Sequence, residues 1–122
     1  MDLSQITKTL VSEIKLTENQ AKIFLHIVIH GRMNTTQISN DLDISFDDAT
    51  QNSKKLVELG GFIEMPNDEF EAMHPRFTAV NMYRKMCERE QKEFKKNLII
   101  DNIGVALEVS YDDVRTKYNK KK

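Results

Sequence analysis

A three-residue turn between two helical segments is the feature that most restricts how this chain can fold. The first segment, TTQISNDL, places Ile38 and Leu42 on one apolar face. The turn DIS follows, and its Ser45 stands three residues before Asp48, a pattern typical of a helix N-terminus near Phe46. A turn of this length is short enough for a helix-turn-helix, which the two segments therefore predict.

Two further helices are expected before this pair. The first is indicated by apolar residues at spacings of three and four: Leu3, Ile6, Leu10 and Ile14. The second begins at LTENQA, because Thr17 and Gln20 have the spacing of a capping box. Gly31 ends this helix.

A hairpin and a long helix are expected after the pair. Gly60 and Gly61 stop the preceding helix, and the runs FIEM and FEAM flank the polar tip PNDE, which predicts a β-hairpin. From about Pro75 a long helix is predicted, extending through the apolar patch at 98–109, although Gly104 can bend or break it. The basic end, from Lys117, is expected to be frayed.

Composition agrees with a mainly helical protein. Four glycines and two prolines among 122 residues leave little room for an all-β fold. No apolar run approaches the roughly 20 residues of a membrane span. The single cysteine, Cys87, cannot form an internal disulfide, which favours a reducing cytoplasm. We predict a mainly α fold with a small β-hairpin: a winged helix-turn-helix domain over 1–75 with its N-terminal helix, and a helical dimerisation segment with a frayed basic tail over 76–122.

Three passages resemble the DNA-binding domain of the TrmB-type transcription regulators, which are found mainly in archaea. They are LTENQAKIFLHIVIHG, TTQISNDLDIS, and LVELGGFIEM followed by Phe70 and AMHP, and together they cover about 16–85. Larger members carry a C-terminal sugar-sensing domain, for which this chain has too few residues after the hairpin. The resemblance implies a small transcription regulator that binds double-stranded DNA without its own sugar sensor.

The helix that starts near Phe46 occupies the position of a DNA recognition helix. Thr50, Gln51 and Lys54 have suitable chemistry, since Gln can pair with adenine and Lys can reach guanine or phosphate. The full set of candidate DNA-binding residues is Arg32, Thr35, Thr36, Gln37, Thr50, Gln51, Lys54, Lys55, Asn67 and Arg76. The family usually has proline and basic or small polar residues where Asp47 and Asp48 stand, so no base-contacting role is assigned to these aspartates, which suit the helix N-terminus.

An acidic middle segment supports a different hypothesis. Residues 41–71 carry nine acidic side chains against Lys54 and Lys55, a net charge of −7, whereas 1–40 carry +1 and 76–122 carry +5. DNA-binding hairpin tips usually present Arg or Lys, but this one presents Asn67, Asp68 and Glu69. The alternative is therefore a winged-helix protein-interaction module whose acidic face binds a basic protein partner.

The segment after the hairpin suggests self-association. Its apolar patch at 98–109 is larger than a three-helix core can cover, which favours a two-fold homodimer, whereas packing back onto its own domain is the alternative. The candidate dimerisation residues are Val80, Tyr83, Cys87, Phe94, Leu98, Ile103 and Leu107.

Enzymatic function is not expected, because the chain has no Gly-rich phosphate loop, paired-cysteine motif or nucleophile motif. His26 and His30 have a spacing that can bind metal, but no third ligand is evident and a structural role is preferred. No metal or cofactor is expected.

Overall fold

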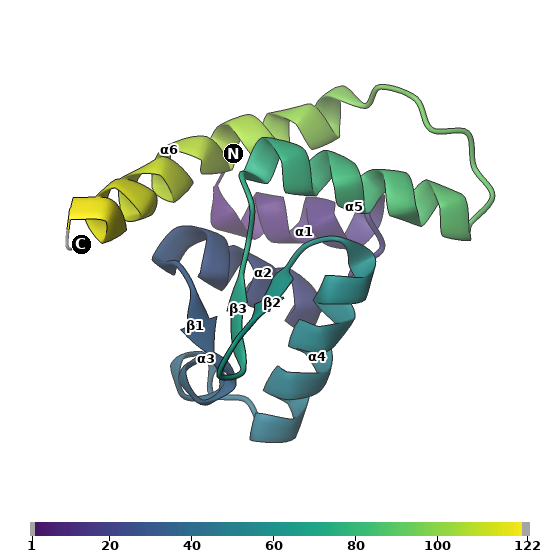
Figure 1. Cartoon of the computed structure of the whole chain (residues 1–122). Helices are drawn as coiled ribbons and strands as arrows, with labels where there is room; N and C mark the ends of the chain where they lie inside the picture. The colour runs from purple at the N-terminus through teal and green to yellow at the C-terminus, as the bar shows by residue number, and fades with distance from the viewer. Residues whose placement is uncertain (1, 121–122) are drawn as a thin grey trace.

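The computed structural model shows a mainly helical molecule with one small sheet (Figure 1), which confirms the expected class. The structure describes residues 2–120, with side chains up to residue 115. The helices are α1 (Leu3–Glu13), α2 (Glu18–His30), α3 (Thr35–Leu42), α4 (Phe46–Leu59), α5 (Pro75–Arg89) and α6 (Leu98–Lys120). No helix among the described residues has the length and apolar character needed to cross a membrane.

The sheet is antiparallel and has three strands in the order β1-β3-β2. The expected hairpin is present as β2 (Ile63–Met65) and β3 (Glu69–Glu71). The expected extended link after α2 contains a third strand, β1 (Met33–Asn34), which pairs with β3. At the hairpin tip Asn67 and Asp68 both have positive φ, 66° and 58°, a backbone that Asn and Asp adopt more readily than most residues and that suits a tight hairpin turn.

Local signals set the helix boundaries. In the predicted capping box, Thr17 Oγ1 accepts from the backbone N–H of Gln20 at 3.1 Å, and Gln20 Oε1 accepts from that of Thr17 at 3.0 Å. Asn34 forms a second capping box at the start of α3. At the end of α4, Gly60 is left-handed with φ 90°, so the N–H of the next residue, Gly61, reaches the carbonyl of Leu56 at 2.8 Å.

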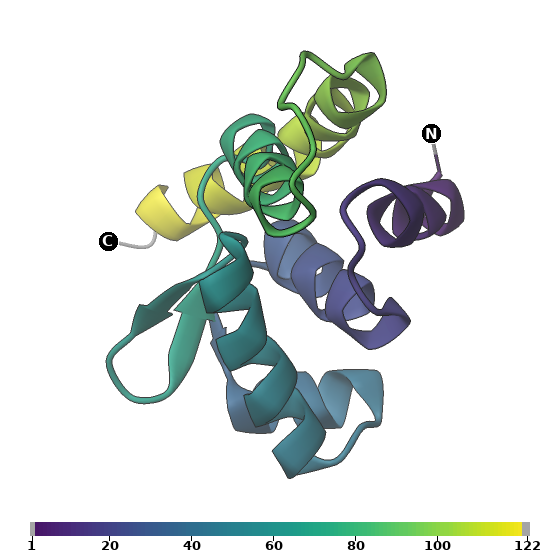
Figure 2. The same cartoon turned by 90° about the vertical axis from the view of Figure 1, so that its right-hand side faces the viewer.

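The core is centred on α2, which α1, α4 and α6 contact from different sides (Figure 2). Ile23 and Phe24 of α2 are fully buried, and the Phe24 ring stacks on Phe62 with 6.1 Å between centroids. The same buried cluster includes Ile103 and Leu107 of α6. The helices before and after the sheet therefore share one hydrophobic core.

The prediction of one long helix from Pro75 is wrong. Helix α5 ends at Arg89, Gln91 takes a positive φ of 55°, and the N–H of Lys92 closes the helix end on the carbonyl of Cys87 at 2.8 Å. After the connection at 90–97, α6 runs back alongside α5 (Figure 1). Gly104 lies within α6 and does not end it. The tail is helical to Lys120, and the expected fraying of Lys121 and Lys122 falls outside the described residues.

This return of α6 corrects part of the predicted dimerisation set. Cys87, Ile103 and Leu107 are at most 2% exposed, because α6 buries its apolar face against α5 and α2 of the same chain. They are not available to a second copy. Val80 and Tyr83 are half-buried, whereas the side chains of Phe94 and Leu98 are exposed at 48% and 67%.

Candidate nucleic-acid interface

Helices α3 and α4 lie at one end of the molecule with the β2–β3 hairpin beside them, and the pair α5–α6 lies at the other end (Figure 2). Residues 43–45 join α3 to α4, as predicted, and Asp43 ends α3 in a left-handed conformation. The Ser45 side chain caps α4 by accepting from the N–H of Asp48 at 3.0 Å. Most of the predicted DNA-binding residues are therefore brought to one end of the fold.

The two faces of α4 differ sharply. Ala49, Ser53 and Leu56, at spacings of four and three residues, are buried against the core. Gln51 and Lys54 lie on the opposite, exposed face. Lys54 has no ion-pair partner among the side chains that the structure describes. The side chains of Gln51 and Lys54 are therefore accessible to a partner on this face of α4.

Two residues of the predicted DNA-binding set, Thr50 and Thr35, have buried side-chain atoms. The Thr50 hydroxyl is buried and has no hydrogen-bond partner among the described residues, because Thr50 lies beside the core-facing stripe of α4 rather than on its exposed face. The Thr35 side chain, at the first residue of α3, is only 3% exposed. The Thr50 hydroxyl and the Thr35 side chain are therefore not accessible to DNA in this arrangement.

The remaining polar candidates are accessible. Thr36 and Gln37 are exposed in the first turn of α3, although the Gln37 side-chain oxygen already accepts from the N–H of Asn34 at 2.9 Å. Asn67 is exposed at the hairpin tip. A hydroxyl or amide group at these positions can donate to a phosphate oxygen.

Three of the four predicted basic contacts are already occupied by carboxylates. Arg32 contacts Glu69 through Nε and Nη2, both at 2.9 Å. Lys55 Nζ lies 3.2 Å from Glu58 Oε2, and Arg76 Nη2 donates to Glu108 Oε2 at 2.8 Å. A phosphate would have to compete with these carboxylates, which weakens the expected electrostatic gain from DNA binding.

The surface around α4 and the hairpin carries exposed acids. The exposed residues are Asp41, Asp43, Asp47, Asp48, Glu58, Glu64 and Asp68. Asp47 and Asp48 lie in the first turn of α4. A negative charge there interacts favourably with the helix dipole and stabilises the helix by about 0.3–1 kcal/mol for each residue. Their helix-stabilising role agrees with the structure, but their charge also faces solvent.

His26 contacts both His30 on the same helix and Asp41 of α3. The two rings lie 4.5 Å apart between centroids, and His26 Nε2 lies 2.8 Å from Asp41 Oδ2. This contact joins α2 to α3 and gives His26 a structural role.

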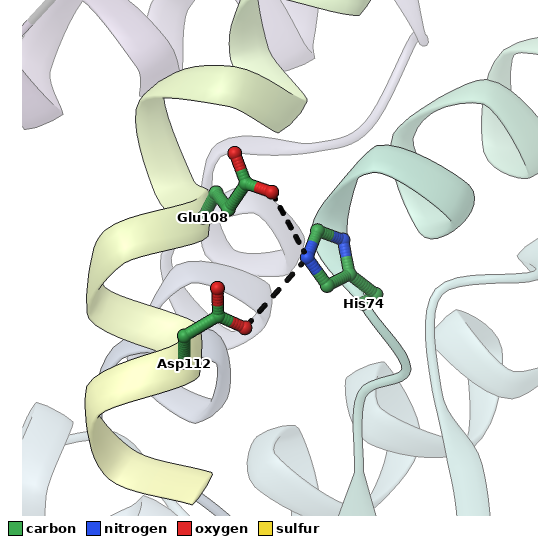
Figure 3. A group of neighbouring side chains, drawn as sticks. All are labelled: His74, Glu108 and Asp112. Carbon is green, nitrogen blue, oxygen red and sulfur yellow. Dashed lines mark ion pairs between the residues drawn. The ribbon is translucent and has the colours of Figure 1, made fainter. Parts of the chain in front are cut away.

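A second charged cluster, His74 with Glu108 and Asp112, was missed from the sequence (Figure 3). His74 Nε2 lies 3.6 Å from Glu108 Oε1 and 3.8 Å from Asp112 Oδ1. Its Nδ1 accepts from the backbone N–H of Arg76 at 3.2 Å, which places the proton of a neutral ring on Nε2. Metal binding requires a free lone pair on Nε2, so the geometry favours a polar cluster in which the Nε2–H of His74 faces the two carboxylates and fastens the start of α5 to α6. The only local signal was the four-residue spacing of the two acids.

The structure also forms a pocket that has no signal in the sequence. It has a volume of about 260 Å³ and lies between the C-terminal end of α2, strand β3 and the second half of α6. Both α2 and β3 were expected, but the pocket exists only because α6 folds back over them. We refer to it below as the α2–β3–α6 pocket.

Comparison with known protein families, curated proteins and solved structures finds no match. The function of this chain is therefore inferred from its own geometry.

Proposed function

We propose that this protein is a DNA-binding transcription regulator with a winged helix-turn-helix. The support is the order of elements from α2 to β3, which is helix, strand, helix, helix and hairpin. The second strand of the hairpin, β3, also pairs with β1, the strand that precedes α3. The single observation that carries the proposal is the exposed placement of Gln51 and Lys54 on α4, the second helix of the pair, beside that hairpin.

Each element has a distinct role in this proposal. The Gln51 amide offers the donor and acceptor that pair with an adenine edge, and Lys54 reaches guanine or phosphate. Thr36 and Asn67 donate to the backbone on either side of the groove. Arg32 and Lys55 add affinity only by exchanging their carboxylate partners for phosphate, so non-specific affinity is expected to be low.

A titration with duplex DNA of random sequence tests this function. Fluorescence anisotropy is expected to show saturable binding at about 50 mM salt and a large loss of affinity by about 200 mM, because bound cations are released when phosphates are neutralised. Selection of tight binders from the same pool should enrich a sequence motif. Absence of binding at the lowest salt would contradict the proposal.

The exposed carboxylates favour one second candidate, a protein-interaction module that binds a basic partner. This candidate predicts that an arginine-rich peptide binds the chain and that duplex DNA does not. The same anisotropy experiment with a labelled peptide separates the two functions. If the peptide binds at low salt and DNA fails to bind, the second candidate replaces the first.

We also propose that the protein forms a homodimer through an apolar stripe on the α5–α6 pair. Leu98, Val105 and Val109 stand at intervals of seven and four residues along α6 and are 67%, 49% and 77% exposed, and Phe77 of α5 is 53% exposed. This spacing places the α6 residues on one face, as in helices that pair with one another. A second copy provides the matching apolar surface and a second α4 for a two-fold DNA site.

Substituting Val109→Asp is expected to shift the protein towards the monomer, since the carboxylate would be placed in the apolar contact. Sedimentation velocity at micromolar concentration measures the shift. Val11→Asp on α1 introduces the same charge at a different exposed valine and should leave the dimer intact. A wild-type protein that sediments as a monomer at this concentration would show that the dimer proposal is wrong.

A further inference from the structure

The α2–β3–α6 pocket has an apolar floor. Ile27 and Val28 of α2, Ala72 after β3 and Val114 of α6 supply its apolar surface. Its volume of about 260 Å³ is slightly below the range of about 300–1,000 Å³ that is usual for pockets of drug-sized ligands. The pocket therefore suits a small molecule with an apolar body.

Charges of both signs surround this floor, and they balance. The lining contains two arginines, Arg32 and Arg115, and two glutamates, Glu69 and Glu71. With His30 neutral, the formal net charge of the described lining is therefore zero. The net charge of the pocket thus selects neither a simple cation nor a simple anion, and the pairing of the individual charges decides which ligand fits.

Two of the four charges are already matched within the protein. Arg32 Nε donates to Glu69 Oε1 at 2.9 Å, and Arg32 Nη2 lies at the same distance from that oxygen. A ligand gains little from either group unless it breaks this contact. The charges left for a ligand are those of Glu71 and Arg115.

Glu71 and Arg115 have opposite charges that are not matched by each other. Among the side chains that the structure describes, the Glu71 carboxylate has no ion-pair or hydrogen-bond partner. Arg115 donates to the neutral hydroxyl of Tyr111, and its guanidinium stands 5.7 Å from the centre of the Tyr111 ring, but it contacts no carboxylate of a described residue. The pocket thus has one unmatched negative group and one unmatched positive group.

These two groups come from different elements. Side chains alternate along a strand, so Glu69 and Glu71 lie on one face of β3, while Phe70, which is 1% exposed, enters the core from the other. Arg115 belongs to the second half of α6. Only the return of α6 brings an arginine to the pocket that Glu71 lines.

We propose that the α2–β3–α6 pocket binds a small zwitterion, an amino acid with an apolar side chain. The ligand's ammonium group pairs with the Glu71 carboxylate, its carboxylate pairs with the Arg115 guanidinium, and its side chain covers the apolar floor. An amine with the same body leaves Arg115 unmatched, and a carboxylic acid with the same body leaves Glu71 unmatched. Only the zwitterion is complementary to both charges.

A ligand bound in this way bridges β3 and α6. Beside Arg115, Val114 packs closely on the end of α2, where a Cβ on Gly31 would stand 2.8 Å from Val114 Cγ1. The bridge therefore holds α2, α6 and the second strand of the hairpin in one arrangement. An effect of this bridge on DNA affinity rests on the proposed function, whereas binding of the zwitterion does not.

Calorimetric titration of the full chain with L-phenylalanine and two analogues tests the site without DNA. Phenethylamine lacks only the carboxylate of phenylalanine, and hydrocinnamate lacks only its amine. We expect phenylalanine to bind at millimolar concentration. Each analogue should bind about tenfold or more weakly, because each loses one charge-assisted contact.

Substitutions assign each contact to its residue. In Glu71→Gln the advantage of phenylalanine over hydrocinnamate should disappear, and in Arg115→Gln its advantage over phenethylamine should disappear. Arg115→Lys keeps the positive charge and should recover binding that Arg115→Gln loses. Glu64→Gln on β2 and Arg89→Gln at the end of α5 remove the same charges from exposed positions outside the pocket and should bind as the wild type does.

Three results would overturn the zwitterion site: no binding of phenylalanine at millimolar concentration, an analogue that binds as tightly as phenylalanine, or wild-type affinity in Glu71→Gln and Arg115→Gln. Because these titrations contain no DNA, they stand or fall separately from the proposed function.

Discussion

Replacing Ile103 with alanine is expected to lower the free energy of unfolding by about 2–5 kcal/mol, the range found for large-to-small changes at buried positions. Ile103 is 0% exposed and belongs to the core cluster that also contains residues of α2. The substitution removes apolar burial and leaves a cavity at the contact between α6 and the rest of the chain. The effect belongs to the single chain and should not depend on dimer formation.

Urea unfolding at several protein concentrations measures this loss. Ile99→Ala provides the matched control, since Ile99 lies in the first turn of the same helix but is 48% exposed, and it should cost much less. If Ile103→Ala unfolds as the wild type does but self-associates more weakly, Ile103 lies in the dimer interface predicted from the sequence. That result would contradict the buried position of α6.

Substituting Gly104→Ala is expected to destabilise the protein by about 1–3 kcal/mol, as for other overpacked core positions. An added Cβ would stand 2.7 Å from the Cα of Arg76 and 3.1 Å from its backbone N. These are backbone atoms at the start of α5, so a side-chain rotation cannot relieve the contact. In an isolated helix the same change would be favourable by about 1 kcal/mol. The sign of the change in stability therefore shows whether Gly104 packs against α5.

Asn102→Ala is the control for this change, because Asn102 is exposed in the same helix and the introduced residue is the same. Helix propensity predicts a small gain there. Chemical denaturation of both variants gives the comparison. A Gly104→Ala protein that is more stable than the wild type would show that α5 and α6 do not approach as closely as the structure has them.

The starts of α2 and α4 and the end of α4 were predictable because their signals are local. The capping box of Thr17 and Gln20 and the stop at Gly60 involve residues within a few positions of one another. The hairpin was equally predictable from two short apolar runs around a polar tip. Such signals depend on backbone hydrogen bonds at element ends and require little knowledge of the tertiary fold.

The return of α6 was not predictable in the same way. The turn that ends α5 places Gln91, rather than glycine, in a left-handed conformation, so the usual stop signal is missing. With a continuous helix assumed, Ile103 and Leu107 resembled an exposed seam, although they complete the core. Gly104 was interpreted as a possible helix breaker, although its absent side chain permits close packing against Arg76.

The helices and the hairpin that carry the candidate site were predictable from the sequence, but the contacts of its side chains were not. The spacing of Ala49, Ser53 and Leu56 predicts the buried face of α4, and Gln51 and Lys54 lie on the exposed face opposite to it. The ion pairs of Arg32 with Glu69 and of Arg76 with Glu108 join residues 37 and 32 positions apart in the sequence. Only the tertiary fold brings these partners together, and they determine which basic groups remain free for a phosphate.

The salt dependence of duplex binding by the wild type and by Lys54→Gln most directly tests whether α4 contacts DNA. The wild-type affinity should fall as the salt concentration rises. Lys54→Gln should bind more weakly, and its plot of log affinity against log salt concentration should have a slope shallower by about one, because one phosphate contact is lost. Lys8→Gln, which removes the same charge from an exposed position on α1, should follow the wild type. Equal affinities and slopes for wild type and Lys54→Gln would contradict DNA contact through this face of α4.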